Sequence, residues 1–376
     1  MRYPVACTKS ASALSMRGGR LFFVVLIALT LPRCSDTGPT APRGPFQLTI
    51  LTALGSSSGP VYDGIVYQSY AYDINSAGEI VGKAETPEGG DAFYPSLWPA
   101  DGGRAIRLEA NGNGLGWAYG INGQGQVVGV GSCGGLGMAC LWDGQQVTNL
   151  GWLDYAVYDG LSQPLAINDS GVAVGWADAA PTGFDHAVIW RNGVATDIGT
   201  LGGLQSEALS INNRGLVVGW SRIRRPDSSL ALAPHAFLWQ NGSMTDLDPG
   251  QDEETIAYAI NDSGVIVGRL GSTTGNAVIW EKGKMSFLPG AEPSQAFGIN
   301  NRGEVVGTYI PSGTTFHAAL WRDGVRYDLN DVVGDPRLGL HWANAVNDAD
   351  QIVGFGVWKS DPTREVAFLL TPTGTR

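Results

Sequence analysis

The twelve residues AYAINDSGVIVG (257–268) contain the local pattern that decides the fold. A short apolar segment leads into Asn-Asp-Ser-Gly, and a β-branched segment follows directly. Asn favours a tight turn through hydrogen bonds of its side chain, and Gly provides the positive φ that such a turn requires. Val and Ile favour strands. The segment therefore predicts two short antiparallel strands joined by a tight turn.

This pattern occurs seven times between residues 71 and 354. The Asn of each turn precedes the next by 47, 46, 44, 49, 39 and 47 residues, at Asn75, Asn122, Asn168, Asn212, Asn261, Asn300 and Asn347. A third apolar segment ends in Trp in six copies, at Trp98, Trp142, Trp190, Trp239, Trp280 and Trp321, whereas the seventh reads AFLL (367–370). A further turn leads to a fourth segment, as in TDLDPG (245–250). Four short strands in ~45 residues are typical of one propeller blade.

We therefore predict an all-β fold, a seven-bladed β-propeller of four-stranded blades over residues 46–376. A β-solenoid is the alternative, although its coils are usually shorter, at about 20–30 residues. The last repeat ends after its third strand, and FQLTILTALG (46–55) has the pattern of a fourth strand without preceding partners. The N-terminal strand is thus predicted to complete the seventh blade, which removes two exposed strand edges.

TDIGTLGGLQSEALSINNRGLVVGWS (196–221) and HAFLWQNGSMTDL (235–247) closely resemble the HAF repeats of a family of bacterial extracellular proteins. The resemblance covers about residues 46–376. It implies a secreted, propeller-like protein, and it implies little about activity, which is not established for the family. The first and seventh repeats match least well, and the seventh has Asp350 where the other turns have Gly.

Residues 1–33 have the pattern of an export signal. Arg17 and Arg20 precede an apolar run of 11 residues (21–31), which is too short to span a bilayer. Met16 is an alternative start, because residues 1–15 add nothing that a signal needs.

Cys34 follows the apolar run within LPRCSD, which resembles a bacterial lipoprotein signal although Pro32 and Arg33 depart from its small residues. We expect Cys34 to be lipidated, with ordinary cleavage nearby as the alternative. Residues 34–45 then form a flexible linker. The expected location is the cell envelope, at the outer membrane or cell surface, and otherwise the periplasm or the medium.

The charge of the chain limits its partners. Its net charge is −11, and all acidic residues lie after residue 33, where 35 of them face 19 basic ones, giving −16. Such an acidic surface argues against nucleic acid and anionic lipid as partners. We expect a monomer that contacts a membrane only through its N-terminal lipid.

No motif predicts catalysis, a metal or a cofactor. His186, His235 and His317 occupy one repeat position and fall in different blades, so they are not expected to share a metal, and we predict hydrogen bonds to neighbouring strands or loops instead. The Asp-rich turns are too short for a calcium loop. No nucleophile elbow, phosphate loop or zinc helix motif occurs. Cys133 and Cys140 flank a short loop and are predicted to form a disulfide.

The predicted binding surface is the face that carries the long loops. The strands of a blade are named a to d from the axis outwards. The a–b and c–d turns are short, whereas the b–c loops and several d–a loops are long. Variable loops on a rigid scaffold are common binding sites. Candidate ligand-binding residues there are Trp117, Trp152, Tyr155, Trp176, Trp220, Arg222, Arg224, Arg225 and Trp342.

These residues favour a non-catalytic module that binds an unknown protein or glycan of the cell envelope. Aromatic side chains suit both sugar rings and protein contacts, and they could equally pack the loops onto the core. A carbohydrate-binding surface lipoprotein is the first alternative. A hydrolase or lyase acting on polysaccharides is the second.

Overall fold

The fold is taken from a computed structural model of the 376-residue chain. It describes residues 46–374 apart from 55–60, 63–64, 87–91, 109–114, 134–137, 154–159, 180–182, 225–229, 250–252, 273–274 and 312–314. The signal peptide, Cys34 and the linker therefore lie outside the described residues. Residues 40–376 form a compact unit of their own.

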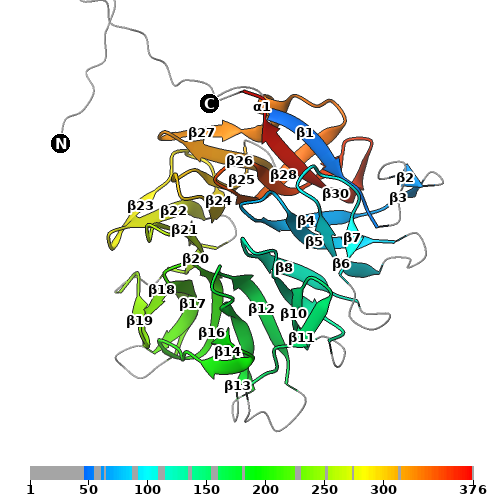
Figure 1. The fold of residues 1–376 in the computed structure, drawn as a ribbon. Coiled ribbons are helices and arrows are strands. Elements are labelled where there is room, and N and C mark those ends of the chain that lie inside the picture. Colours follow the sequence, from blue (N-terminus) through cyan, green and yellow to red (C-terminus); the bar gives the residue numbers. More distant parts are fainter. Residues whose placement is uncertain are drawn as a thin grey trace, which may run out of the picture. The chain divides into compact units, whose positions relative to one another are not determined.

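Seven four-stranded antiparallel sheets follow one another around a central axis, as Figure 1 shows. Blade 1 consists of β4 (Ser69–Ile74), β5 (Ile80–Glu85), β6 (Phe93–Trp98) and β7 (Ile106–Arg107). Blade 2 consists of β8 (Trp117–Ile121), β9 (Val127–Gly131), β10 (Met138–Asp143) and β11 (Gln146–Asn149). Blade 3 consists of β12 (Ser162–Ile167), β13 (Ala173–Ala179), β14 (Phe184–Arg191) and β15 (Val194–Asp197). The first strand of each blade lines the axis.

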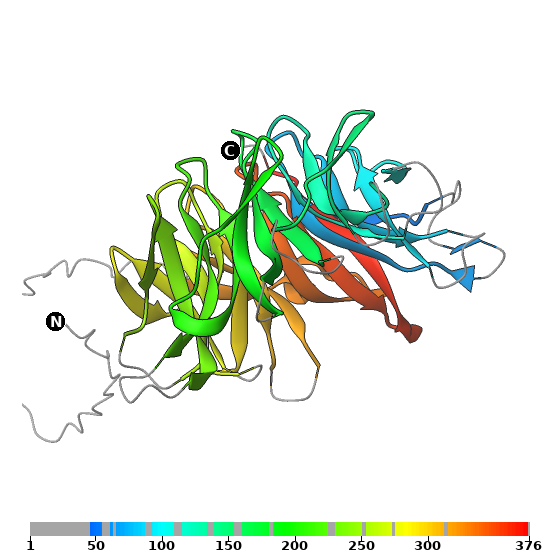
Figure 2. The same cartoon turned by 90° about the horizontal axis from the view of Figure 1, so that it is seen from below.

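Blades 4 to 6 repeat this order. Blade 4 consists of β16 (Gly202–Ile211), β17 (Val217–Arg224), β18 (Leu230–Gln240) and β19 (Ser243–Asp246). Blade 5 consists of β20 (Thr255–Ile260), β21 (Ile266–Leu270), β22 (Asn276–Glu281) and β23 (Lys284–Phe287). Blade 6 consists of β24 (Ser294–Ile299), β25 (Val305–Tyr309), β26 (His317–Arg322) and β27 (Val325–Asp328). Figure 2, turned by 90°, shows the strands running between the two faces of the propeller.

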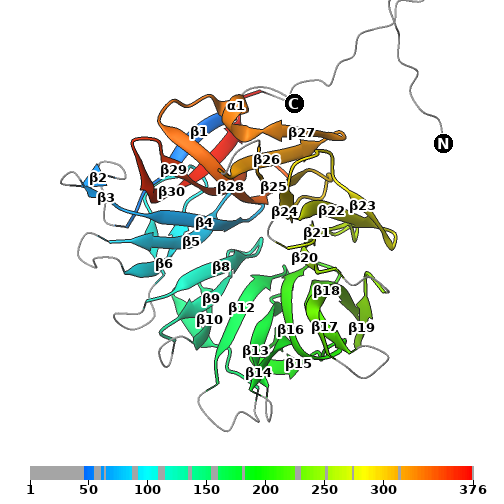
Figure 3. The same cartoon turned by 180° about the vertical axis from the view of Figure 1, so that it is seen from behind.

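Blade 7 joins the two ends of the propeller. Its strands are β28 (Leu338–Val346), β29 (Ile352–Trp358), β30 (Asp361–Pro372) and, outermost, β1 (Phe46–Leu51), which lies against β30 in Figure 3. The pairing extends from Phe46 opposite Pro372 to Leu51 opposite Ala367. The predicted seven-bladed propeller and its closure by the N-terminal strand are confirmed.

Three elements were not expected from the repeat. A two-stranded hairpin, β2 (Val61–Tyr62) and β3 (Ile65–Val66), follows β1. A short helix, α1 (Leu329–Val333), begins at Asp328, whose side chain accepts a hydrogen bond from the Asn330 N–H. In blade 4 the region expected to be a long b–c loop is mostly strand, because β17 continues to Arg224 and β18 begins at Leu230.

Apolar side chains fill the space between neighbouring blades. Five of the six repeated Trp side chains are buried, with exposures of 0–2%, and Trp239 is partly buried. In blade 7, Leu370 occupies the Trp position and pairs with Ile352 just as Trp98 pairs with Ile80 in blade 1. The interpretation of these Trp residues as blade packing is confirmed.

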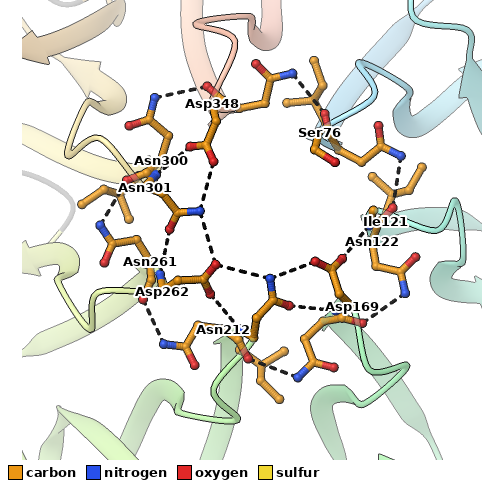
Figure 4. Close-up of a pocket in the computed structure, with 18 of the residues that line it drawn as sticks. Ser76, Ile121, Asn122, Asp169, Asn212, Asn261, Asp262, Asn300, Asn301 and Asp348 are labelled. Carbon is orange, nitrogen blue, oxygen red and sulfur yellow. Dashed lines mark hydrogen bonds between the residues drawn. The ribbon is translucent and has the colours of Figure 1, made fainter.

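The repeated Asn has two functions in the structure. At six of the seven turns its Oδ1 accepts hydrogen bonds from the N–H groups two and four residues later, and at Asn261 from the fourth, so the predicted turn chemistry is present. Its Nδ2 donates to the backbone carbonyl of the equivalent Asn in the next blade, at 2.9–3.1 Å. The last of these bonds runs from Asn347 to Asn75. Seven side chains, each 3–6% exposed, thus form a closed ring of hydrogen bonds, drawn in Figure 4.

Blade 7 keeps the turn without glycine. Asp350 has a φ of 62°, the left-handed conformation that Gly adopts in the other six turns. Asp tolerates this conformation better than most residues. Its carboxylate forms an ion pair with Arg302, which extends from blade 6.

The closure by β1 can be tested with two single substitutions on that strand. Leu51 is fully buried against Trp98 and Val353, whereas Gln47 is exposed. Leu51→Ala should lower the free energy of unfolding by about 2–5 kcal/mol, and Gln47→Ala by less than about 0.5 kcal/mol. Removing residues 46–55 should abolish the cooperative transition in urea. Equal stability of the shortened and complete proteins would show that β1 does not hold the ring closed.

The ring of Asn side chains predicts a pH-dependent variant. Asn212→Asp keeps the acceptor that caps the turn and loses the donor to the Asn261 carbonyl, so it should cost about 2–3 kcal/mol at pH 7. The introduced carboxylate faces a carbonyl oxygen, which raises its pKa in the folded protein above the unfolded value, so the loss of stability should shrink as pH falls toward 4. Asn241→Asp, in an exposed c–d turn, is the matched control and should show neither effect. A loss that is the same at pH 4 and pH 7 would exclude the missing donor as its cause.

Candidate functional site

The central channel has two different ends. We call the end at the a–b turns the turn end, and the end at the b–c and d–a connections the mouth. A cavity of about 420 Å³ at the turn end is lined by each ring Asn, by the residue before it and by the residue after it (Figure 4). The residues before are six Ile and one Val, Ile74, Ile121, Ile167, Ile211, Ile260, Ile299 and Val346. The residues after are Ser76, Gly123, Asp169, Asn213, Asp262, Asn301 and Asp348.

Carboxylates and amides alternate in this outer layer from blade 3 to blade 7. Asp169, Asp262 and Asp348 each accept a hydrogen bond from the N–H of the preceding blade, at 2.7–2.8 Å. The side-chain amide of Asn213 lies between Asp169 and Asp262, and donates to both. Asn301 joins Asp262 and Asp348 in the same way. These contacts join the blades, and among the described residues no group of three or more His, Cys, Asp or Glu is placed to hold a metal.

Beyond the apolar layer, the middle of the channel contains a second cavity of about 220 Å³. Each blade contributes to its lining the residue three positions before the ring Asn, at Tyr72, Tyr119, Leu165, Leu209, Tyr258, Phe297 and Asn344. Asp73 is the one carboxylate among the residues that line it. Burial raises the pKa of Asp73 to about 6, although its oxygens accept hydrogen bonds from the Ile74 and Ile121 N–H groups.

The mouth is formed by one residue from each inner strand, five positions before the ring Asn. We call these seven residues the mouth ring: Tyr70, Trp117, Gln163, Glu207, Ile256, Gln295 and Trp342. Each lies opposite a residue of the second strand, in the pairs Tyr70–Lys83, Trp117–Val130, Gln163–Trp176, Glu207–Trp220, Ile256–Arg269, Gln295–Thr308 and Trp342–Phe355. The ring is aromatic in blades 7, 1 and 2 and mostly polar in blades 3 to 6.

A chain of ring contacts extends along the aromatic side. Trp342 contacts Phe316 of the adjoining blade and stacks on Phe355, with 4.9 Å between ring centroids in each case. Phe355 contacts Tyr70 edge-on at 5.0 Å. From Tyr70 the contacts continue through Tyr72 and Tyr119 to Trp117, at 6.5, 5.6 and 6.5 Å. We call these seven residues the aromatic arc, and it extends over blades 6, 7, 1 and 2.

Lys83 lies in a cage formed by two residues of this arc and by Phe93. Its ammonium nitrogen lies 4.3 Å from the ring centroids of both Tyr70 and Phe93, and 5.6 Å from that of Trp117. Aromatic faces attract cations at such distances. The Tyr70 hydroxyl donates to Glu365, and burial together with this carboxylate raises the Tyr70 pKa well above its usual value.

Two indoles lie on the polar side. Trp220 Nε1 donates to Glu207 Oε2 at 3.3 Å. Burial raises the pKa of Glu207 to about 7, with a smaller contribution from Asp185 and an opposing one from the Trp220 hydrogen bond. Trp176 has the same position in blade 3, opposite Gln163. All of these side chains are partly exposed.

The predicted ligand-binding residues divide into four groups. Trp117, Trp176, Trp220 and Trp342 belong to the mouth ring or its paired strand residues, and Trp117 is 38% exposed. Trp152 is partly buried in the β11–β12 connection. Arg222 and Arg224 bond within blade 4, to Gln205 Oε1 at 2.9 Å and the Gly202 carbonyl at 3.3 Å. Tyr155 and Arg225 lie outside the described residues.

Sequence reasoning did not single out Tyr70, Phe355, Gln163 and Glu207 as mouth residues. The signal was available, because each lies at a fixed distance from a repeated Asn or from the Gly that follows it. Comparing equivalent positions across the seven repeats would have collected Tyr70, Gln163 and Glu207 into one layer. None of the four is a Trp or an Arg, so the Trp and Arg residues of the loops do not point to them.

The other predicted pairs are present. His186, His235 and His317 bond through Nδ1 to Asp197, Asp246 and Asp328 of the neighbouring outer strand, at 2.8, 2.9 and 2.6 Å. The hydrogen bond to Asp197 raises the pKa of His186. Cys133 and Cys140 form a disulfide with 5.8 Å between Cα atoms. No helix among the described residues is long and apolar enough to cross a membrane.

Comparisons with known proteins show the fold alone. No family model and no curated protein sequence matches the chain. Among solved structures, the β-propeller domain of the Trilobed protease from Pyrococcus furiosus is similar at a TM-score of 0.50 and 11% identity, over 69% of this chain and 81% of that one. A puromycin-hydrolyzing peptidase of Mycobacterium tuberculosis is similar at 0.54 and 12%, over 89% of this chain and 52% of the peptidase. YCF48 bound to D1 peptide is similar at 0.49 and 13%, over 88% and 96%. The chain is similar to these proteins as a β-propeller.

Proposed function

We propose that this protein is an exported, non-catalytic binding module whose ligand binds at the mouth of the channel. The aromatic arc is the observation that carries the proposal. None of its seven rings is buried, and Tyr72 and Tyr119 line the cavity in the middle of the channel. Concave sites rich in aromatic side chains with a few polar groups are typical of ligand binding.

The distribution of exposed apolar side chains supports the same end. Seven large apolar side chains are clearly exposed among the described residues, at Ile106, Leu115, Trp117, Leu161, Phe184, Val194 and Phe287. Four of them, Leu115, Trp117, Leu161 and Phe184, belong to the connections or strand ends at the mouth. None of the seven lies at the turn end of the inner strands.

We infer the setting of this module from the sequence. The segment before residue 34 has the pattern of an export signal, and Cys34 that of a lipidation site, which would attach the propeller to the cell envelope through residues 34–45. The repeats resemble HAF repeats, and their recurring His bonds to an outer-strand Asp in three blades, which accounts for that part of the repeat. Membership of that family and lipid attachment are parts of this proposal.

A polysaccharide-acting hydrolase is the second candidate. It is favoured by three carboxyl groups near one another on the polar side of the mouth, where Asp178 hydrogen-bonds to Asp185, and Asp185 raises the pKa of Glu207. Hydrolases of this kind pair a protonated acid with an ionised carboxylate. Release of new reducing ends when the protein is incubated with cellotetraose, chitotetraose or maltotetraose would favour the hydrolase over the binding module.

Binding at the mouth predicts which substitutions weaken it. The compact unit, residues 40–376, is titrated with soluble glycans and envelope peptides while tryptophan fluorescence is recorded. Trp117→Ala and Trp342→Ala should each weaken the binding of the responding ligand at least tenfold, or about 1.4 kcal/mol. Phe287→Ala, which removes a 60% exposed ring from an outer strand, is the matched control and should leave affinity unchanged. Binding that survives both Trp substitutions would place the site elsewhere.

A further inference from the structure

We propose that the mouth binds a saccharide, which lies against the aromatic arc and is hydrogen-bonded by Gln163, Glu207 and Gln295, with Glu207 as the residue that sets specificity. This inference rests on the proposed function and names the ligand class of that site.

The two sides of the mouth ring match the two kinds of surface on a sugar. The aromatic arc presents ring faces in blades 7, 1 and 2, on which the C–H face of a pyranose can stack. The opposite side presents Gln163, Glu207 and Gln295 from equivalent positions of their inner strands. An amide both donates and accepts, and so does a protonated carboxyl, which is what hydroxyl groups require.

The charges at the mouth favour a neutral ligand over an anionic one. Lys83 is enclosed by Tyr70, Phe93 and Trp117, with Glu365 close by. Arg269 is 7% exposed and bonds to Glu254, Tyr258 and the Gly271 carbonyl. Lys83 and Arg269, the described cations among the mouth ring and its paired residues, are therefore already engaged within the protein. These two side chains therefore offer a phosphate or sulfate little of the charged hydrogen bonding that anion sites use.

The hydrogen bonds that Glu207 can make depend on its protonation state, because a protonated carboxyl donates as well as accepts, whereas a carboxylate only accepts. Trp220 Nε1 donates to Oε2, and this bond within blade 4 orients the carboxyl. The charged groups that face it come from blade 3, where Asp185 on β14 raises the pKa of Glu207 and is itself bonded to Asp178 of β13. His186 on β14 is bonded to Asp197.

The described cations of the remaining neighbouring strands are not among the groups that shift the pKa of Glu207. On β17, Arg222 bonds to Gln205 and Arg224 to the Gly202 carbonyl. β12 contains no charged residue, and the Tyr258 of β20 accepts a hydrogen bond from Arg269. Burial is accordingly the main cause that raises the pKa of Glu207 to about 7.

A bound saccharide would exclude more water from this carboxyl and so favour its neutral form further. Binding should therefore be coupled to proton uptake, with full affinity below the free pKa of Glu207 and a loss as pH rises through 7. Glu207→Gln imitates the protonated carboxyl in shape and hydrogen bonding. At every pH, this variant should bind the saccharide with the affinity that the wild type has at low pH.

The test is calorimetric titration of residues 40–376 with cellotetraose, chitotetraose and maltotetraose at pH 5.5 and pH 8.5. At least one should bind, and its affinity should fall about three- to tenfold between these pH values. Glu207→Gln should abolish the pH dependence while binding is kept, and Glu207→Ala should weaken binding at both pH values. Glu281→Gln, which changes an exposed carboxylate at a c–d turn, should behave as the wild type does.

A second readout needs no ligand. The fluorescence of Trp220 should change with a midpoint near pH 7 in the wild type, and this transition should be absent in Glu207→Gln. Failure of all three tetrasaccharides at pH 5.5, or pH dependence that persists in Glu207→Gln, would overturn the inference. Peptide binding lost in Trp117→Ala alongside no tetrasaccharide binding would overturn it too, while leaving the proposed function intact.

Discussion

The hydrogen bond from each repeated Asn side chain to the next Asn carbonyl is the contact on which the propeller depends. It joins every blade to its neighbour through a group that is 3–6% exposed, so each donor would be costly to leave unpaired. The same side chain caps its own turn through Oδ1. Local turn geometry and the packing of blades are therefore fixed by one residue type. The seventh bond runs from Asn347 back to Asn75, so the seven blades form a closed ring in which every repeated Asn donates to one neighbour and accepts from the other.

This arrangement separates the structural end of the channel from the variable end. At the turn end, the Asn ring and the Ile and Val layer repeat in every blade, and Asp and Asn alternate in blades 3 to 7. Five residues nearer the mouth, the inner strands carry Tyr70, Trp117, Glu207 and other unlike residues. No repeated interblade bond fixes the identity of these described residues, so this layer can differ in every blade. A single composite site is the expected result, with one aromatic and one polar side.

The repeat made most of the fold predictable, because the contacts it encodes are local. Asn75 and Gly78 specify a turn by their own backbone preferences, and the missing fourth strand of the last repeat identified β1 as its partner. The Nδ2 bond to the next blade could not be derived in this way, since it depends on the distance between two turns 47 residues apart. Likewise Trp220 was recognisable as a mouth residue, but the pKa of its partner Glu207 depends on burial and on Asp185 of another blade. Both the bonds between blades and the pKa of Glu207 depend on residues that are distant in the sequence, which a local pattern does not specify.

The closed ring of Asn side chains is tested most directly by native-state hydrogen exchange. The seven reporters are the N–H groups that bond to Oδ1 four residues after each Asn, at Glu79, Gln126, Val172, Leu216, Val265, Glu304 and Gln351. If the ring unites all blades, these seven amides exchange with one free energy, within about 1 kcal/mol of global unfolding. If Gln351 and Glu79, on either side of the closure, exchange through a separate opening of much lower free energy, the ring is not the contact that holds the propeller together.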